Sequence, residues 1–522
     1  MYPTHPPRFR LSGFLWRLLV VTAGAIAMSS GSLSAQTLHV PSGTYSAEMF
    51  AGLIERVEAG FADRIVGSGE VVIECSGSAG RAFNPPHLST TLAAPARRGD
   101  SVVVVASAAN VRMGDHIRLK SDTLVETGWS YGQASLSRVN AVRGRTIVLQ
   151  DTLHFDYVAD GEMSVHFYRP RSLLIEGVDF DLTGWKDTVA RAAIRIEGFA
   201  VEFVDVGGRG TPDRRLDLLQ VVYAPTVAIR KFRSTDLRYG AMLATCRNVD
   251  ARGIHAVNVR HAIAPTSWTS RVHVRGLVGT DTYLDAHPSF DVTYDSVRIL
   301  RGGDLGLRGF GITLRDAVIH QRPKTSRTYL GPVSLNDRGR QLAGDYAIVF
   351  DNVTIVGSVG DSPGYNILAV YPCGRLEVRR STLPSIATVT PMPSVVIRDS
   401  RLGRFYAYAM GFDIRRTSFE AALQGRGNDP LPPLRGSWSG SARIERCTFT
   451  GYDSTALIAY ASSPDTRYDF VDCAFGSFDA LFAETYRPVE AYRGLTFSGC
   501  VPLEMPGTIR SNLLTNSLEV IR

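Results

Sequence analysis

Apolar positions recur in one short phrase along most of this chain. From about residue 170 the order is apolar, any, small or polar, variable, any, apolar. Successive copies start 17 to 36 residues apart, mostly in the twenties. The fourteen copies are IEGVDF at 175, IEGFAV at 196, IRKFRS at 229, ARGIHA at 251, VRGLVG at 274, YDSVRI at 294, LRDAVI at 314, FDNVTI at 350, VRRSTL at 378, IRDSRL at 397, IRRTSF at 414, IERCTF at 444, FVDCAF at 470 and FSGCVP at 497.

This spacing predicts an all-β repeat protein. Segments of helical length with 3.6-residue periodicity are absent, and each phrase fits a strand, a tight corner and a second strand. A coil of roughly twenty residues cannot bury its apolar face alone, whereas coils stacked at about 4.8 Å share one core and pair every backbone group. We therefore expect a parallel β-solenoid with three strands per coil, running as one body from about 165 to 500.

The phrases also resemble a known family. "NVTI", "VVIRDSRL" and "ARIERCTF" resemble the repeat of the right-handed parallel β-helix superfamily, which includes pectate lyases, polygalacturonases and phage tailspikes. The resemblance covers roughly 165–500. It implies that each phrase forms the second and third strands of a coil, and that the strand before it lines a binding groove. Many members act on polysaccharides, whereas others only bind or form fibres.

The N-terminus has the pattern of a targeting segment. Arg8, Arg10 and Arg17 precede the apolar run LLVVTAGAIAM, which is too short to span a bilayer, and SLSAQ ends in small residues. We expect residues 1–35 to be a signal peptide that is cut after Ala35, which places the mature chain in the periplasm or outside the cell. No later apolar run reaches about 18 residues, so we expect no membrane span after cleavage.

The remaining chain divides by composition into three expected regions. Residues 36–168 show an opening coil followed by four or five strands separated by Gly and Asp turns, which predicts a small inserted β-barrel or sandwich. Residues 169–505 carry the repeat, and residues 506–522 are a C-terminal tail or cap. Because the phrase spacing jumps to 36 there, we expect 322–345 to be a loop beside the groove.

Net charge bears on the class of ligand, and the spacing of three cysteines bears on how the last coils stack. The formal charge of +7 falls to near +4 when the three arginines of the leader are removed, which gives weak support for an acidic glycan and little for nucleic acid. Cys447, Cys473 and Cys500 occupy the same position of three successive phrases. We expect them to form one inward column, in which stacking would also allow a disulfide.

Candidate chemistry gathers on three groove strands. His261, Asp285, His287 and Arg308 precede phrases that are spaced by about twenty residues, so stacking places them within roughly 5–10 Å of one another. Histidine is suited to proton transfer near neutral pH, a neighbouring carboxylate orients it, and arginine can clamp a uronate carboxylate. We expect either His287 or His261 to transfer the proton, with Asp285 as the orienting partner and Arg308 facing the substrate's negative charge.

These residue types favour β-elimination from an acidic polysaccharide. Hydrolysis would need two carboxylates across the scissile bond, and candidates for that pair keep a glycosidase open, namely Asp281, Asp285, Asp291 and Asp304. A third alternative is a non-catalytic glycan-binding or surface scaffold. Asp285 and His287 alone are a weak metal signal, so no metal ligand is assigned, and the cofactor is left open.

Departures from the characterised relatives limit what the resemblance implies. The Asn-Thr-Asp, Asp-Asp, Gly-His-Gly and Arg-Ile-Lys set of polygalacturonases is absent, and no lysine lies in a groove segment. The run of His261, "LDAHP" and "GLRG" resembles a pattern in poorly characterised β-helix proteins of bacteria and phage, which implies no established reaction. The expected partner is a polysaccharide, with the oligomeric state open.

Aromatic side chains in the groove segments are candidate sugar-binding residues. Their amphipathic rings suit sugar faces, although tyrosine also simply favours strands. The candidates are Tyr239, Trp268, Tyr283, Tyr371, Tyr406 and Tyr408.

Overall fold

The computed structural model describes most of the chain between residues 36 and 500. The gaps are 126–131, 160–162, 214, 322–327, 332–334, 358–367, 389, 408, 425–431, 437–440, 453–455, 462–466, 477, 479, 485–494. The expected signal peptide and the expected tail 506–522 lie outside the described residues. Among the residues that the structure describes, no helix has both the length and the apolar character needed to cross a bilayer.

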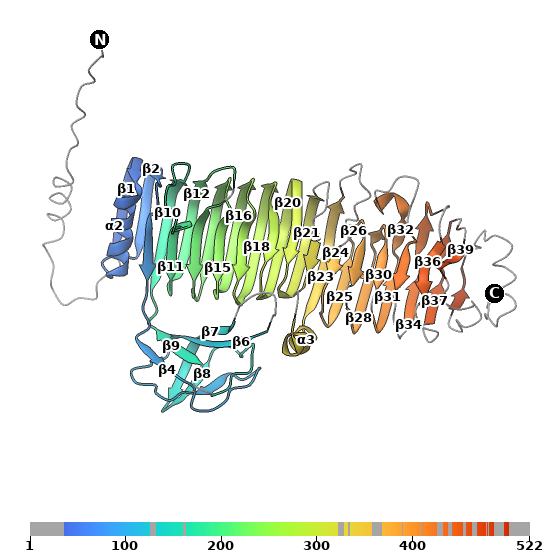
Figure 1. Ribbon diagram of the computed structural model, residues 1–522, viewed down its shortest axis with the longest axis horizontal. Coiled ribbons are helices and arrows are strands. Elements are labelled where there is room, and N and C mark those ends of the chain that lie inside the picture. Colours follow the sequence, from blue (N-terminus) through green and yellow to red (C-terminus); the bar gives the residue numbers. More distant parts are fainter. Residues whose placement is uncertain are drawn as a thin grey trace, which may run out of the picture.

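Two parallel ladders of strands run the length of the molecule (Figure 1). Each strand pairs with the strand one coil further on, so the backbone winds as a solenoid. Ladder A contains β1 (Thr37–Ser46), β2 (Arg64–Glu74), β10 (Ser172–Asp181), β12 (Ala200–Arg209), β14 (Val227–Thr235), β16 (Arg247–Val257), β18 (Thr269–Thr280), β20 (Ser289–Leu307), β21 (Phe310–Gln321), β23 (Ala347–Val356), β25 (Arg375–Arg379), β26 (Thr382–Leu383), β28 (Ser394–Arg398), β29 (Arg401–Leu402), β31 (Gly411–Arg415), β32 (Ser418–Glu420), β34 (Ser441–Glu445), β35 (Thr448–Thr450), β37 (Arg467–Val471), β38 (Ala474–Phe475) and β40 (Leu495–Ser498).

Ladder B contains the strands that precede the phrases. It consists of β3 (Gly80–Phe83), β11 (Ala192–Glu197), β13 (Asp217–Val222), β15 (Tyr239–Ala244), β17 (His261–Thr266), β19 (Tyr283–Ala286), the end of β20, β22 (Thr328–Leu330), β24 (Leu368–Val370), β27 (Ile386–Thr388), β30 (Phe405–Ala407), β33 (Leu434–Gly436), β36 (Ala456–Ala461) and β39 (Ala480–Glu484). The prediction of an all-β, right-handed parallel β-helix is confirmed. Later coils show three strands each, as in β27, β28 and β29.

The corner inside each phrase explains the residue preference at its third position. In thirteen of the copies this residue has a positive φ, between 47° and 67°. Glycine, asparagine and aspartate tolerate this left-handed conformation best, which is why the position is small or polar. The residues are Gly177, Lys231, Gly253, Gly276, Ser296, Asp316, Asn352, Arg380, Asp399, Arg416, Arg446, Asp472 and Gly499.

One copy was assigned to the wrong corner. IEGFAV at 196 spans the turn between β11 and β12, where Gly198 has φ 77°. The corner of that coil is instead FVDVGG at 203, with Asp205 at φ 53°. Both corners need a left-handed residue followed by an inward apolar one, so the letters alone do not distinguish them.

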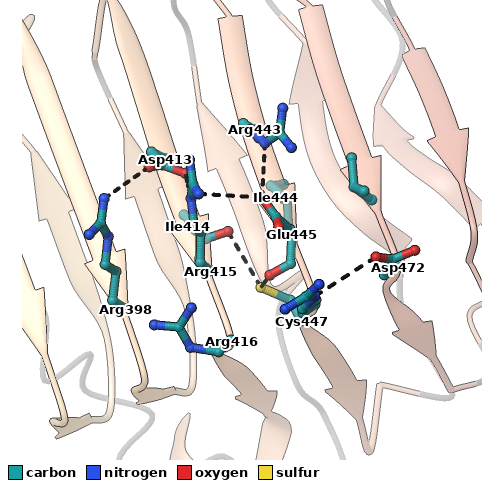
Figure 2. Close-up of polar contacts among 12 residues, drawn as sticks. Arg398, Asp413, Ile414, Arg415, Arg416, Arg443, Ile444, Glu445, Cys447 and Asp472 are labelled. Atoms are coloured by element: carbon teal, nitrogen blue, oxygen red, sulfur yellow. Dashed lines mark hydrogen bonds and ion pairs between the residues drawn. The ribbon is translucent and has the colours of Figure 1, made fainter.

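The predicted column of cysteines is confirmed. Cys447 and Cys473 are fully buried, Cys500 is half-buried, and all three are free thiols. The Sγ of Cys447 lies 3.7 Å from the Ile414 carbonyl of the preceding coil (Figure 2). Cys473 repeats this contact one coil later, at 3.3 Å from the Ile444 carbonyl. The column continues toward the N-terminus as Thr417, Ser400 and Ser381, so it is a ladder of small inward groups.

The outer face of ladder A in the last coils carries charges of alternating sign. Arg398 and Arg415 contact Asp413, and Arg443 contacts Glu445 at 3.0 Å (Figure 2). These side chains are partly exposed, so solvent screens each pair and its contribution to stability is small. Positive and negative side chains therefore lie next to each other on this face of the parallel sheet.

The N-terminal end of the solenoid is covered by a helix. α2 (Ala47–Glu58) begins at Ser46, whose Oγ accepts a hydrogen bond from the N–H of Met49. Its apolar face buries Phe50, Ile54 and Val57, and the ring of Phe50 packs edge-on against Phe180. The helix therefore protects the first coil from pairing with another sheet.

A small antiparallel barrel is inserted between β3 and β10 and projects from the side of the coils (Figure 1). Leu92 bridges Val105, which joins the two outer strands and closes the sheet. Its strands are β4 (Leu88–Thr90), β5 (Val102–Val104), β6 (His116–Leu124), β7 (Gly132–Arg143), β8 (Thr146–Leu149) and β9 (Ser164–Tyr168), in the order β4-β9-β6-β7-β8-β5.

The barrel packs on aromatic residues at one corner of the helix. Trp268, Phe290 and Phe310 stack along successive coils with centroids 5.7 and 5.3 Å apart. From the barrel, Phe155 lies 4.8 Å from Trp268, and His154 stacks 4.1 Å from Phe290. This apolar contact fixes the barrel beside the coils that hold β17 and β19.

The expectation of a loop over 322–345 is wrong for the described part of that segment. β22 extends ladder B by pairing with β20 and β24. α3 (Asp337–Ala343) follows, and its capping residue Asn336 donates a hydrogen bond to the Leu124 carbonyl of the barrel. The extra residues therefore add one strand to ladder B and a helix whose cap contacts the barrel. The remaining short helix is the 3₁₀ turn η1 (Ala421–Gln424).

Candidate functional site

The structure brings three of the candidate residues into one buried cluster on the outer face of ladder B. The Nε2 atom of His287 lies 2.9 Å from Oδ2 of Asp285. The Nδ1 atom of His261, one coil earlier, lies 3.7 Å from the same oxygen. Asp285 is fully buried, and His261 and His287 are 4% and 5% exposed. The carboxylate is therefore held between two imidazoles in a site largely shielded from water.

His261 is held by ring contacts. Its ring stacks on Tyr239 at 5.1 Å and meets Tyr283 and His287 edge-on, each at 5.9 Å. Within the described part of the chain, neither ring nitrogen of His261 has a hydrogen-bond partner. A buried imidazole in this state is costly, and such groups are typical of sites that complete their bonding with a ligand.

The local fold explains why Asp285 faces outward. Leu284 and Ala286 belong to the apolar core, so Asp285 and His287 alternate with them onto the outer face. β17 and β19 pair only at His261 and Tyr283, whereas β15 and β17 pair at five positions. The break in pairing lets Asp285 face out where Ile263 of the previous coil faces the core.

Two further residues, which the sequence did not single out, support this break. Tyr294 comes from ladder A, is fully buried, and its hydroxyl lies 2.6 Å from the Asp285 carbonyl and 3.1 Å from the Ile263 carbonyl. On the next coil, Gly306 leaves room for the carboxylate, because a Cβ there would lie 2.9 Å from Oδ1 of Asp285. Tyr294 could have been noticed as the one hydroxyl at a phrase position that is otherwise apolar.

The electrostatics of the cluster favour neutral histidine beside ionised aspartate. Burial lowers the pKa of His261 to about 4, against the opposing effect of Asp285. Burial raises the pKa of Asp285, but His261, His287 and Arg308 lower it more, so the net pKa lies below the ordinary value. At neutral pH the site therefore holds a carboxylate and an uncharged His261 imidazole.

Arg308 completes the predicted set from the following coil. Its backbone N–H donates to the carbonyl of Ala286, between Asp285 and His287, at 2.6 Å. Its charge acts on both His261 and Asp285. On the other side of the cluster, Arg238 pairs with the buried Asp217 and lies 4.7 Å from the Tyr239 ring.

The candidate aromatic residues separate into three groups. Tyr239 and Tyr283 are half-buried and contact His261, so they belong to the cluster. Trp268 was wrongly placed in the groove: it is 3% exposed, packs against the barrel, and donates its indole N–H to the Gly132 carbonyl at 2.6 Å. Tyr371 and Tyr406 lie three and five rungs beyond Asp285, roughly 14 and 24 Å along the axis.

The remaining candidates are Tyr408 and the carboxylates considered for hydrolysis. Tyr408 lies outside the described residues. Asp281 pairs with Arg301 at 2.9 Å, and Asp291 lies at a left-handed corner next to the barrel-facing Phe290. Asp304, which is 8% exposed and one rung beyond Tyr283, is the carboxylate best placed to act with Asp285.

The same three residues have the donor set of a metal site. One ligand atom each from His261, Asp285 and His287 lie within 4.8 Å of one another. Two imidazoles and one carboxylate suit a divalent transition metal such as Zn²⁺. The geometry therefore allows proton transfer or metal binding, and these two uses exclude each other because each needs the same nitrogen lone pairs.

Comparisons with known proteins return only structural likenesses. No family model matches the sequence, and no curated protein matches it. Among solved structures, the chain is similar to the tailspike gp61 of Pseudomonas phage phi297, at 13% identity and a TM-score of 0.44, over 87% of this chain and 73% of that one. It is also similar to the tailspike gp49 of Pseudomonas phage LKA1, at 13% identity and 0.42, over 94% and 78%. A third is the gp54 tailspike of Acinetobacter baumannii bacteriophage AP22, solved with a capsular saccharide, at 14% identity and 0.41, over 96% and 75%.

Proposed function

We propose that this protein cleaves an acidic polysaccharide by β-elimination at the His261–Asp285–His287 cluster. The observation that carries the proposal is the buried Asp285 carboxylate 2.9 Å from Nε2 of His287, with His261 beside it on the next rung. A carboxylate in this position orients the imidazole and stabilises the imidazolium that forms when the ring accepts a proton.

The proposal gives each residue of the cluster one role. His287, whose Nε2 lies 2.9 Å from Oδ2 of Asp285, accepts through Nδ1 the proton on the carbon next to the uronate carboxylate. The electron pair of that C–H bond forms a C=C bond and the adjacent C–O bond to the next sugar breaks. The leaving oxygen takes a proton from the His287 imidazolium, which returns the base to its neutral form. Arg308 faces the uronate carboxylate and stabilises its extra charge in the transition state. His261 is neutral and offers a hydrogen bond to a substrate oxygen.

Substrate access and location belong to the same proposal. Tyr239 and Tyr283 contact His261 from the rungs on either side of it, so their half-exposed rings are the aromatic groups beside the cluster that a sugar would meet. Export to the periplasm or the exterior, inferred from residues 1–35, would bring the chain to such a polymer.

The test is turnover on a panel of uronic-acid polysaccharides, followed by the absorbance of unsaturated products. Loss of a general base removes about 10²–10⁴-fold in rate, so His287→Ala should reduce turnover by that factor. His39→Ala is the matched control, since His39 is an exposed residue of β1 in the first coil. Full activity in His287→Ala would place the reaction elsewhere.

Two outcomes would redirect the proposal. Loss of activity on chelation, with recovery on adding Zn²⁺, would make the three residues metal ligands. Reducing-end release without unsaturated product would favour a glycosidase, in which Asp285 and Asp304 would be the carboxylate pair.

A further inference from the structure

A second polar pocket lies on the seam between the inserted barrel and the coils. It encloses about 350 Å³ and takes its walls from both parts. His116 and Arg138 come from strands β6 and β7 of the barrel, and Arg247 and Asn248 come from the start of β16. The seam is fixed by the aromatic contact between Phe155 and Trp268, so the two walls have a defined spacing.

The charge on this pocket has one sign. Arg138 and Arg247 both line it, and among the described residues no carboxylate does. Arg247 is 5% exposed, whereas Arg138 is exposed at the opening. A buried and an exposed guanidinium on facing walls form the arrangement that binds an oxyanion between them.

Arg247 is held in place from behind. Its guanidinium contacts Asp151, which also pairs with Arg271 at 2.8 Å and accepts a hydrogen bond from Ser137 at 3.2 Å. Two arginines therefore share one carboxylate and leave an excess of positive charge. Burial, and then Arg271, lower the pKa of Arg247 to about 9, which still leaves it charged at neutral pH.

His116 adds a neutral group with unused bonding capacity. Its Nδ1 is buried and has no hydrogen-bond partner in the described part of the chain. Burial, followed by the charges of Arg138 and Arg247, lowers its pKa to about 4. The ring is thus uncharged at neutral pH, and as the Nδ1–H tautomer it can donate to an anion.

We propose that this pocket binds a carboxylate or sulfate group of an acidic saccharide, clamped between Arg138 and Arg247 with His116 as an additional donor. The saccharide origin of the anion rests on the proposed function, whereas the anion site itself does not. The pocket belongs to the coil of Tyr239, one coil before His261. It would hold a charged sugar of a chain that continues toward the cluster.

Calorimetric titration with galacturonic acid, galactose 6-sulfate and neutral galactose tests the site. The two acidic sugars should bind and galactose should not. Whichever of the two binds with the lower Kd shows whether the pocket prefers a carboxylate or a sulfate. Charge-assisted hydrogen bonds of this kind correspond to roughly a tenfold or greater change in Kd. Arg138→Ala should therefore weaken binding at least tenfold, and Arg138→Lys should restore part of it.

The matched control is Arg143→Ala, an exposed arginine on the same strand β7 that does not line the pocket. It should bind the acids as the parent chain does. Equal affinity for galactose and the acids, or unchanged affinity in Arg138→Ala, would overturn the site. Repeating the titration in His287→Ala separates the two proposals, because anion binding there is expected to persist even if no turnover is found in the parent chain.

Discussion

At the scale of single residues, the position of Asp285 depends on groups that do not touch substrate. The Tyr294 hydroxyl holds the carbonyls of Asp285 and Ile263 at the break between β17 and β19. Tyr294→Phe keeps the ring in the core and removes this bond, which costs about 1 kcal/mol of folding free energy. We expect turnover to fall roughly tenfold, because a shift of the Asp285–His287 pair by a fraction of an ångström misplaces His287 as the base.

Tyr452→Phe is the matched control for this prediction. Its buried hydroxyl also donates to a carbonyl, that of Gly403 at 2.5 Å, but in the C-terminal coils. Both variants should lose similar stability in urea titrations, and only Tyr294→Phe should lose kcat. Equal kcat in the two would make Tyr294 a purely structural residue.

Gly306 makes a second residue-scale prediction. A methyl group at this position would lie 2.9 Å from Oδ1 of Asp285, closer than unstrained contacts allow. Gly306→Ala should push the carboxylate away from His287 and reduce turnover at least tenfold. Gly411→Ala, where the nearest atom to the new methyl is the Ser441 carbonyl at 3.4 Å, should leave turnover unchanged. If the two alanines behave alike, the space above Gly306 has no role in catalysis.

At the scale of elements, the left-handed corner of each phrase predicts where stability can be gained. Lys231 occupies that corner with φ 54°, a conformation that costs a residue with a Cβ about 1 kcal/mol or more. Asparagine tolerates it better, so Lys231→Asn should stabilise the protein by about 0.5–1 kcal/mol. Thermal or urea unfolding measures this gain. Arg298→Asn, at an exposed strand position, should give none.

The repeat shows how far elements can be predicted from the sequence. The spacing of apolar positions predicted parallel coils, the strands of ladder B and the cysteine column, because these depend only on local periodicity. It failed at 196–201 because Gly198 and the phrase corners share one backbone conformation. It failed at 322–345 because β22 is three residues long and carries no phrase.

The candidate site was predictable only in part. Stacking placed His261, Asp285 and Arg308 on neighbouring rungs, as the coil spacing of about twenty indicated. The outward turn of Asp285 was not predictable, since it depends on the interrupted pairing of β17 and β19 and on Tyr294 from the opposite ladder. Trp268 was misplaced because the docking of the barrel on that corner is a contact between segments about 110 residues apart.

At the scale of the whole molecule, buried neutral histidines make the free energy of unfolding depend on pH. Burial lowers the pKa of His116, His154 and His261 to about 4. The unfolded chain takes up protons near pH 6.5, the folded chain only near pH 4, so unfolding free energy falls as pH drops through that window and levels off below it. Each histidine contributes about 3 kcal/mol at most, by the size of its shift.

His154→Phe tests this dependence, because phenylalanine can keep the stack on Phe290 at the seam. Urea titrations between pH 4 and pH 6.5 should show a shallower fall in unfolding free energy than in the parent chain, by about one proton. A slope identical to that of the parent would mean that His154 is not proton-linked to folding.

The insertion of the barrel leaves the winding of the coils uninterrupted. β2 pairs with β10 and β3 pairs with β11 as though no residues lay between them. The side chain of Asn84, where the chain leaves the coil, donates to the carbonyl of Arg169, where it returns, at 2.9 Å. In topological terms the barrel is an insertion whose two ends meet, so it can be exchanged or lost without changing the winding of the solenoid. The pocket between barrel and coils would change with it, so ligand preference there can change while the coils stay the same.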